Sequence, residues 1–144
     1  MNDLIHNDVL WASALAWFIA QLSKAVVVAL REHRFHARTM LSAGGMPSSH
    51  SALVTALTTR IGMEQGTGSA MFALAAIFAG VVLYDAAGVR RAVSMQARTL
   101  NRMIEELFEQ QKFNERRLIE LLGHTPFEVF VGALLGIVTA LTFV

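Results

Sequence analysis

The stretch GGMPSSHSALVTAL, residues 44–57, places a polar cluster directly before an apolar segment. Glycine and proline favour a turn, and serine is a preferred residue at the start of a helix. Ser48, Ser49 and His50 therefore stand where a helix is expected to begin. Backbone N–H groups and the helix dipole attract anions at such a start. The stretch predicts a turn, a helix start and a candidate anion site.

The composition favours a small membrane protein. The chain has 144 residues, 54% of them hydrophobic, and a net charge of +1. This apolar fraction is high for a soluble protein, and the length suits one domain over residues 1–144. The small net charge argues against a nucleic-acid partner. The chain has no cysteine and its histidines form no metal-binding motif, so we expect neither a metal nor another cofactor.

The apolar segments predict an all-α fold, a polytopic membrane helical bundle with about four membrane segments. A transmembrane helix needs about 20 apolar residues. Residues 9–30, 68–89 and 125–144 meet this requirement. Residues 48–62 are shorter, roughly 22 Å as a helix, and the sequence leaves open whether they cross the bilayer fully.

Basic residues gather in the connections 31–47 and 90–124, whereas the N-terminus and residues 61–67 carry none. By the positive-inside rule both long connections face the cytoplasm and both termini lie outside, as in a bacterial inner membrane protein. Apolar residues recur at helical spacing between Leu100 and Phe108. They predict an amphipathic cytoplasmic helix on the membrane surface or over the spans, with a solvated connector as the alternative.

Because the segments alternate in direction, ionisable residues from all of them meet at one face, predicted to be cytoplasmic. Ionisable groups at membrane depth are costly and usually functional. Cations, hydroxyls and helix N-termini suit a phosphate, and two histidines add a nucleophile and a proton donor. The residues at this face are Lys24, Arg31, Ser48, Ser49, His50, Asp85, Arg90, Arg91, His124 and Glu128.

Several of these residues also have a structural interpretation. Ser48 or Ser49 can serve only as an N-cap, and His50 as a hydrogen-bonded polar residue at a helix start. Lys24 and Arg31 leave one face of the first helix and can extend toward lipid headgroups.

The residues of the third and fourth segments have such interpretations too. Residues 125–128, TPFE, form a capping-box pattern that accounts for Glu128, although Glu128 also follows His124 by four residues and can fix its tautomer. Asp85 can pair with a neighbouring arginine. Gly132 and Gly136 form a GxxxG pattern typical of close helix packing, which also allows a homodimer.

Three segments of the chain resemble a known family: GGMPSSHSALVTAL, YDAAGVRRAVSMQARTLN and LGHTPFEVFVGALLGI. The chain is similar to the superfamily of type-2 phosphatidic acid phosphatases and vanadium-dependent haloperoxidases. It is most similar to the short bacterial and plant branch described as divergent or acid-phosphatase-related. The resemblance runs from about residue 20 to the C-terminus.

Two motifs of the superfamily imply phosphate ligands. The first is a lysine followed seven residues later by arginine and proline. Lys24 and Arg31 have that spacing, whereas Glu32 replaces the proline. The second motif, PSGH, appears as PSSH at 47–50, with serine where glycine is usual. It implies that its serines and backbone amides hold phosphate and that His50 protonates the leaving oxygen.

The third motif has an arginine six residues before a nucleophilic histidine and an aspartate four residues after it. His124 and Glu128 match the histidine and the acid. The arginine is missing, since Arg117 is one residue out of register, and Arg90 or Arg91 is expected to supply the charge.

By this resemblance the protein is a metal-independent phosphatase that forms a phosphohistidine on His124. Its substrate is a phosphate monoester or diphosphate of a polyprenyl or glycerol lipid in the bilayer. One alternative is a non-catalytic membrane protein that binds a phosphorylated lipid or anion. Another is a helical scaffold that dimerises through its glycines.

Overall fold

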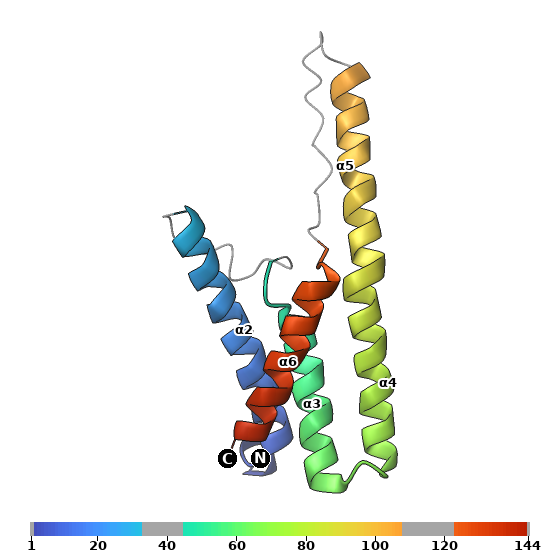
Figure 1. The fold of residues 1–144 in the computed structure, drawn as a ribbon. Coiled ribbons are helices and arrows are strands. Elements are labelled where there is room, and N and C mark those ends of the chain that lie inside the picture. The colour runs from blue at the N-terminus through green and yellow to red at the C-terminus, as the bar shows by residue number, and fades with distance from the viewer. Residues whose placement is uncertain (1, 33–44, 108–122, 144) are drawn as a thin grey trace.

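The structure, a computed structural model, describes residues 2–32, 45–107 and 123–143. All regular secondary structure in these ranges is helical, which confirms the predicted class (Figure 1). The segments Asp8–Leu30 and Ala70–Ile104 are long and apolar enough to cross a membrane, whereas the last helix is apolar but shorter. The helices are α1 (Asn2–Ile5), α2 (Asp8–Glu32), α3 (Ser49–Gln65), α4 (Ala70–Tyr84), the π-helix η2 (Asp85–Val89), α5 (Arg90–Leu107) and α6 (Pro126–Thr142).

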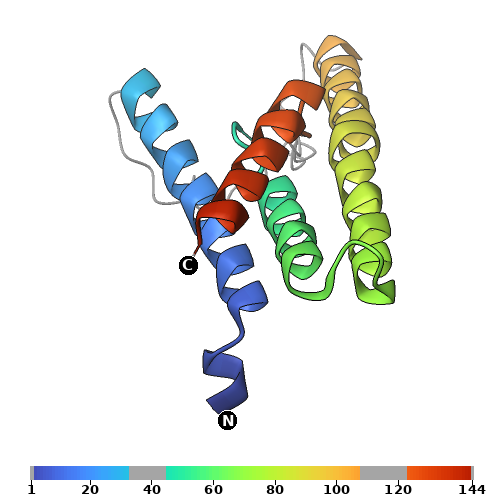
Figure 2. The same ribbon diagram turned by 60° about the horizontal axis from the view of Figure 1, so that its bottom comes forward.

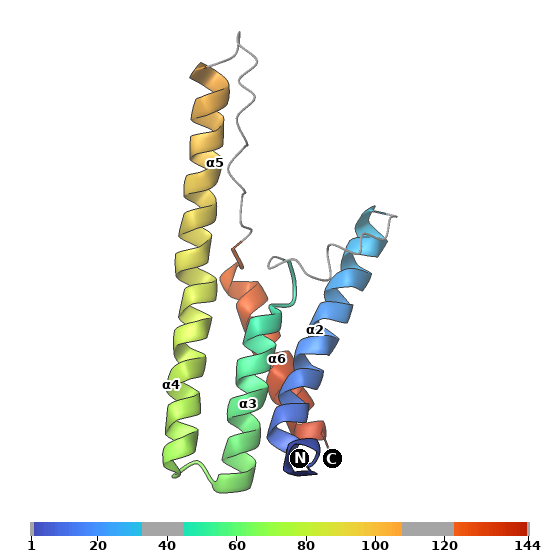
Figure 3. The same cartoon turned by 180° about the vertical axis from the view of Figure 1, so that it is seen from behind.

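Helix α3 lies at the centre of the bundle and packs against α2, α4 and α6. Figures 1 and 3 show α3 and α6 side by side, with α2 on one side and α4 on the other. The end of α2, the start of α3, the end of α4 and the start of α6 lie toward the same end of the bundle, and both chain termini lie at the other. The alternation predicted from the sequence is therefore present.

The central helix is the least apolar of the four that form the bundle. It buries Ser51, Ala52, Thr55 and Ala56 against its neighbours. Helices that pack in a bilayer approach closely through small residues and share hydrogen bonds, because lipid gives no hydrophobic drive for association. The composition of α3 is typical of a helix shielded from lipid by other helices.

The packing of the bundle places small side chains inside and large apolar ones outside. The buried cluster consists of Ala16, Ala20, Ala52, Ala56 and Ala140, with Leu135 against it. A soluble protein rarely exposes so much contiguous apolar surface, so this arrangement fits a surface in contact with lipid. Exposed apolar side chains on α2, α4 and α6 include Phe18, Leu22, Leu74, Ile77, Phe78, Phe130 and Leu134.

Helix α6 rests directly on the backbone of α3 through two glycines. A Cβ atom at Gly132 would overlap the backbone of Ser48, and one at Gly136 would overlap Ala52 O and the Thr55 hydroxyl. That hydroxyl is shared between Ser51 O, at 2.8 Å, and Ala133 O of α6, at 3.0 Å. The GxxxG pattern thus serves packing within one chain, and a homodimer would need another surface.

Helix α5 continues the direction of α4 through η2 and extends beyond the rest of the bundle (Figures 1 and 2). The apolar segment Ala70–Ile104 has 35 residues, about 50 Å of helix at 1.5 Å per residue. A hydrocarbon core is about 30 Å thick. The predicted amphipathic helix is present as α5, but it continues α4 in a straight line and does not fold back over the other helices.

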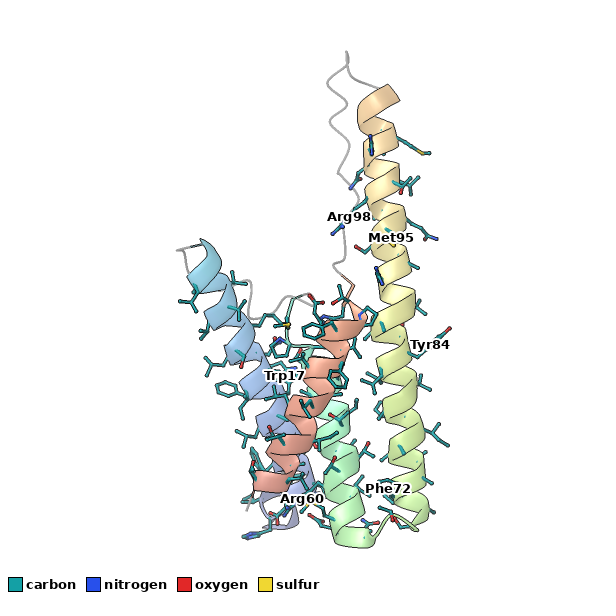
Figure 4. All side chains as sticks on the ribbon, in the orientation of Figure 1. Trp17, Arg60, Phe72, Tyr84, Met95 and Arg98 are labelled. Atoms are coloured by element: carbon teal, nitrogen blue, oxygen red, sulfur yellow. The ribbon has the colours of Figure 1, made fainter. Side chains whose placement is uncertain are left out.

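Charged residues also meet at the opposite end of the bundle, which sequence reasoning missed. Arg60, near the end of α3, pairs with Asp8 at 3.2 Å and with Glu64 at 3.0 Å. It also donates to Phe143 O at 3.1 Å, and Figure 4 shows Arg60 at this end. Arg60 therefore ties the start of α2 and the end of α6 to α3.

We predict that Gly136→Ala strongly destabilises the bundle, by about 1–3 kcal/mol or more, because the new methyl group overlaps the α3 backbone. Gly80→Ala in α4 is the matched control, since no atom of the described residues lies within 4 Å of its Cβ position. In thermal unfolding in detergent, the melting temperature should fall clearly for Gly136→Ala and change little for Gly80→Ala. Equal melting temperatures would contradict the close contact of α6 with α3.

Candidate functional site

A cavity of about 260 Å³ lies at the end of the bundle where the predicted site residues gather. His50 of α3 and His124, just before α6, both line this cavity. His50 is exposed, whereas His124 is 2% exposed, so the cavity connects a solvent-accessible imidazole with a buried one. The remaining lining residues are Val81, Val82, Asp85 and Ala86, from α4 and η2.

The start of α3 is fixed by its cap and by the start of α6. Ser48 is the N-cap, as one interpretation of the sequence held, and its hydroxyl accepts from Ser51 N–H at 3.4 Å and Ser51 Oγ–H at 2.9 Å. Ser48 N–H donates to Glu128 O at 3.2 Å. Ser48, Ser49 and Ser51 are all buried. This links the serine cluster to the helix that follows His124.

Glu128 carries out both roles that the sequence left open. The capping box with Thr125 is present, and Glu128 Oε2 accepts from Thr125 N–H at 2.9 Å. The same oxygen lies 3.3 Å from His124 Nδ1. Because a carboxylate only accepts, Nδ1 carries the proton and Nε2 keeps a free lone pair. Nε2 is buried and has no hydrogen-bond partner among the described residues, and it is the atom suited to nucleophilic attack.

The surroundings of His124 keep its ring neutral. Burial lowers the pKa of His124 below its ordinary value of 6.5, whereas the hydrogen bond and the charge of Glu128 act in the opposite direction. Positive charge on Lys24 and His50 adds to the lowering. A neutral imidazole at pH 7 is the form that can act as a nucleophile.

Lys24 is turned into the bundle. It is 1% exposed, so extension toward lipid headgroups is not its role in this structure. Its stem lies beside Gly45, where an added Cβ would be 3.4 Å from Lys24 Cγ. Gly45 has φ of +90°, which favours glycine, and it allows the loop before α3 to pass over the lysine. A buried cation thus lies at the same end of the bundle as the two histidines.

Among the predicted arginines, Arg91 is the one whose side chain the structure describes. Arg91 is exposed on α5. The side chains of Arg31 and Arg90 are not described, and Arg117 lies outside the described residues. Within the described ranges, no three His, Cys, Asp or Glu side chains gather to hold a metal ion.

Sequence reasoning missed Ser51 beside the α3 cap and the apolar wall of the cavity. Ser51 follows the cap residue by three positions, a spacing that could have indicated its contact with Ser48. The apolar wall formed by Val81, Val82 and Ala86 gave no signal, because these residues read as ordinary lipid-facing positions. The π-helical turn that begins at Asp85 also has no local sequence signature.

Comparisons with known proteins cover almost the whole chain. A family model described as the divergent PAP2 family matches residues 5–139, which include every candidate site residue. The uncharacterized membrane protein YuiD of Bacillus subtilis (strain 168) is 38% identical over 150 residues, covering 96% of this chain and 95% of the relative. No solved structure matches.

We predict that His124 stays mostly neutral at pH 6.5, where an ordinary histidine is half protonated, because burial lowers its pKa. Nitrogen-15 NMR of histidine-labelled protein in detergent should show Nδ1–H and an unprotonated Nε2. In Glu128→Gln the midpoint of the His124 titration should move to still lower pH, since the carboxylate charge is lost. A midpoint that rises in this variant would contradict the contact between His124 and Glu128.

Proposed function

The chain belongs to the divergent PAP2 family, and on that premise we propose that it is a membrane phosphatase acting on lipid phosphates. The observation that carries the proposal is the buried Nε2 of His124, which has no hydrogen-bond partner in the described part of the chain and belongs to a residue that shares a cavity with His50. A lone pair without a partner in a buried site is costly unless a ligand uses it. An electrophilic phosphorus is a ligand that a neutral imidazole can attack.

The reaction proceeds in two steps. His124 Nε2 attacks phosphorus, the bond to the lipid oxygen breaks, and His50 gives that oxygen its proton. The neutral His50 then takes a proton from water, the resulting hydroxide attacks phosphorus, and the bond to His124 breaks. Glu128 holds Nδ1–H throughout and stabilises the positive charge of the phosphohistidine ring.

Phosphate binding is proposed for the residues around the cavity. Lys24 supplies positive charge from α2, and the first turn of α3 supplies backbone N–H groups behind Ser48 and Ser49. Arg31, Arg90 and Arg91 are proposed as further ligands, with Arg117 in support. The site stabilises the pentacoordinate phosphorus by charge and position alone, so vanadate should inhibit it.

The membrane placement follows from the helices and the charges. A 38% identical relative is a membrane protein, and two segments of this chain are long enough to span. We propose that α2, α3, α4 and α6 form the bundle in a bacterial inner membrane, with both termini outside and the site at the cytoplasmic face. A site at that depth suits polyprenyl phosphate, polyprenyl diphosphate or phosphatidic acid.

We predict that the purified protein releases phosphate from at least one of these lipids and that vanadate blocks the release. His124→Ala should reduce the rate to that of buffer, because it removes the nucleophile. His6→Ala is the matched control, since His6 is exposed at the opposite end of the bundle and should leave activity unchanged.

Lipid binding separates catalysis from the non-catalytic alternative. If the wild-type protein binds the lipids and releases no phosphate from any of them, the protein is a binding protein for phosphorylated lipids. If His124→Ala remains as active as the wild type, the phosphohistidine mechanism is wrong.

We predict that a cysteine at Arg34 reacts with a membrane-impermeant reagent only from the cytoplasmic side, and one at Gly68 only from outside. The chain has no cysteine of its own, so each variant has a single target. Gly68 is exposed, and its Cβ position has no neighbour within 4 Å in the part of the chain that the structure describes, so it should tolerate the change. Labelling of Arg34→Cys from outside would reverse the proposed orientation.

A further inference from the structure

One cavity residue has no role in the mechanism above. Asp85 begins the π-helix η2, and its side chain lines the cavity together with His50 and His124. One face of the long helix carries Val81 and Val82 and, four residues after each, Asp85 and Ala86. The cavity wall is therefore continuous across the junction of α4 and η2. Turns with π geometry often mark functional positions.

The approach of η2 to α6 explains why Asp85 reaches this cavity. Helix α4 packs on α3, and α6 meets the long helix at η2. Asp85 therefore stands where that helix comes close to the residues that begin α6. Figure 4 shows the neighbouring Tyr84 pointing away from the bundle, and it is 76% exposed, so the two adjacent side chains face opposite environments.

A carboxylate in the wall of a phosphate cavity needs an explanation, because it repels the substrate. A neighbouring imidazolium removes the repulsion, since the pair is neutral overall. Glu128 already accepts hydrogen bonds from Thr125 N–H and His124 Nδ1–H. Among the described residues that line the cavity, Asp85 is the carboxylate that can act on the other histidine.

The two histidines have opposite tasks at the start of the reaction. His124 must be neutral to attack phosphorus, and His50 must carry the proton that it gives to the leaving oxygen. Asp85 of η2 and His124 line the same cavity as His50, and His124 is also acted on by Lys24 of α2 and Glu128 of α6. Positive charge on Lys24 opposes protonation of His50, so a carboxylate must offset it.

We propose that Asp85 is a positioning residue that holds His50 in its protonated form, ready to protonate the leaving alkoxide. This inference rests on the proposed phosphatase function. His50 loses the proton when the bond from phosphorus to the lipid oxygen breaks, and regains one from water in the second step. The Asp85 carboxylate favours the protonated ring of His50 at the start of each cycle.

The test is the pH dependence of kcat/KM, which covers the steps up to release of the lipid alcohol. In Asp85→Asn the basic limb of the kcat/KM profile should move to lower pH by about 1 unit. The value of kcat/KM should therefore fall about tenfold at pH 8 and change little at pH 6. Asp85→Glu should restore most of the profile. Asp8→Asn is the control, because Asp8 pairs with Arg60 at the other end of the bundle.

A second measurement does not depend on catalysis. Nitrogen-15 NMR of histidine-labelled protein, with the His50 signal assigned through His50→Gln, follows the protonation of His50 directly. The pH midpoint of His50 protonation should fall in Asp85→Asn and stay unchanged in Asp8→Asn. An equal loss of activity at every pH, or an unchanged His50 midpoint, would overturn the inference. If Asp85→Asn shifts the His50 midpoint but the wild-type protein releases no phosphate, the pairing of Asp85 with His50 is supported and the proposed phosphatase function is refuted.

Discussion

The structure depends on the close approach of two helix backbones, α6 on α3. Only the absence of side chains at Gly132 and Gly136 allows Ser48 and Ala52 to lie against α6. The same approach lets Ser48 N–H reach Glu128 O at 3.2 Å. Since one of these residues caps α3 and the other belongs to the first turn of α6, the contact fixes the starts of both helices relative to each other. Those starts carry the two histidines.

The bundle combines a polar centre with an apolar exterior, which is the reverse of a soluble domain. Alanines and hydroxyl side chains fill the space between helices, while phenylalanine, leucine and isoleucine cover the outside. In lipid, the free energy of association comes from close packing and shared hydrogen bonds rather than from removing apolar surface from water. The central helix can therefore be short and comparatively polar, and polar groups can be held at membrane depth.

One carboxylate oxygen in the candidate site both caps a helix and contacts a histidine. Oε2 of Glu128 caps the first turn of α6 and also orients His124. Because the capping box fixes Glu128 on the backbone, the carboxylate cannot turn away from the imidazole without uncapping the helix. The sequence presented the helix cap and the contact with His124 as alternatives for Glu128, whereas one oxygen atom accepts from both donors.

The amino-acid sequence alone predicts the helical class, the four apolar segments, the caps at Ser48 and Thr125, and the residues from which a site could be built. These features depend on neighbours within one helical turn, or on hydropathy along the chain, and both can be read locally. The folded structure was needed to show that Gly132 and Gly136 face α3, that α5 continues α4, that Lys24 turns inward, and that Asp85 shares a cavity with two histidines. Each of these depends on contacts between distant residues or on how two helices join, and no local pattern specifies such contacts.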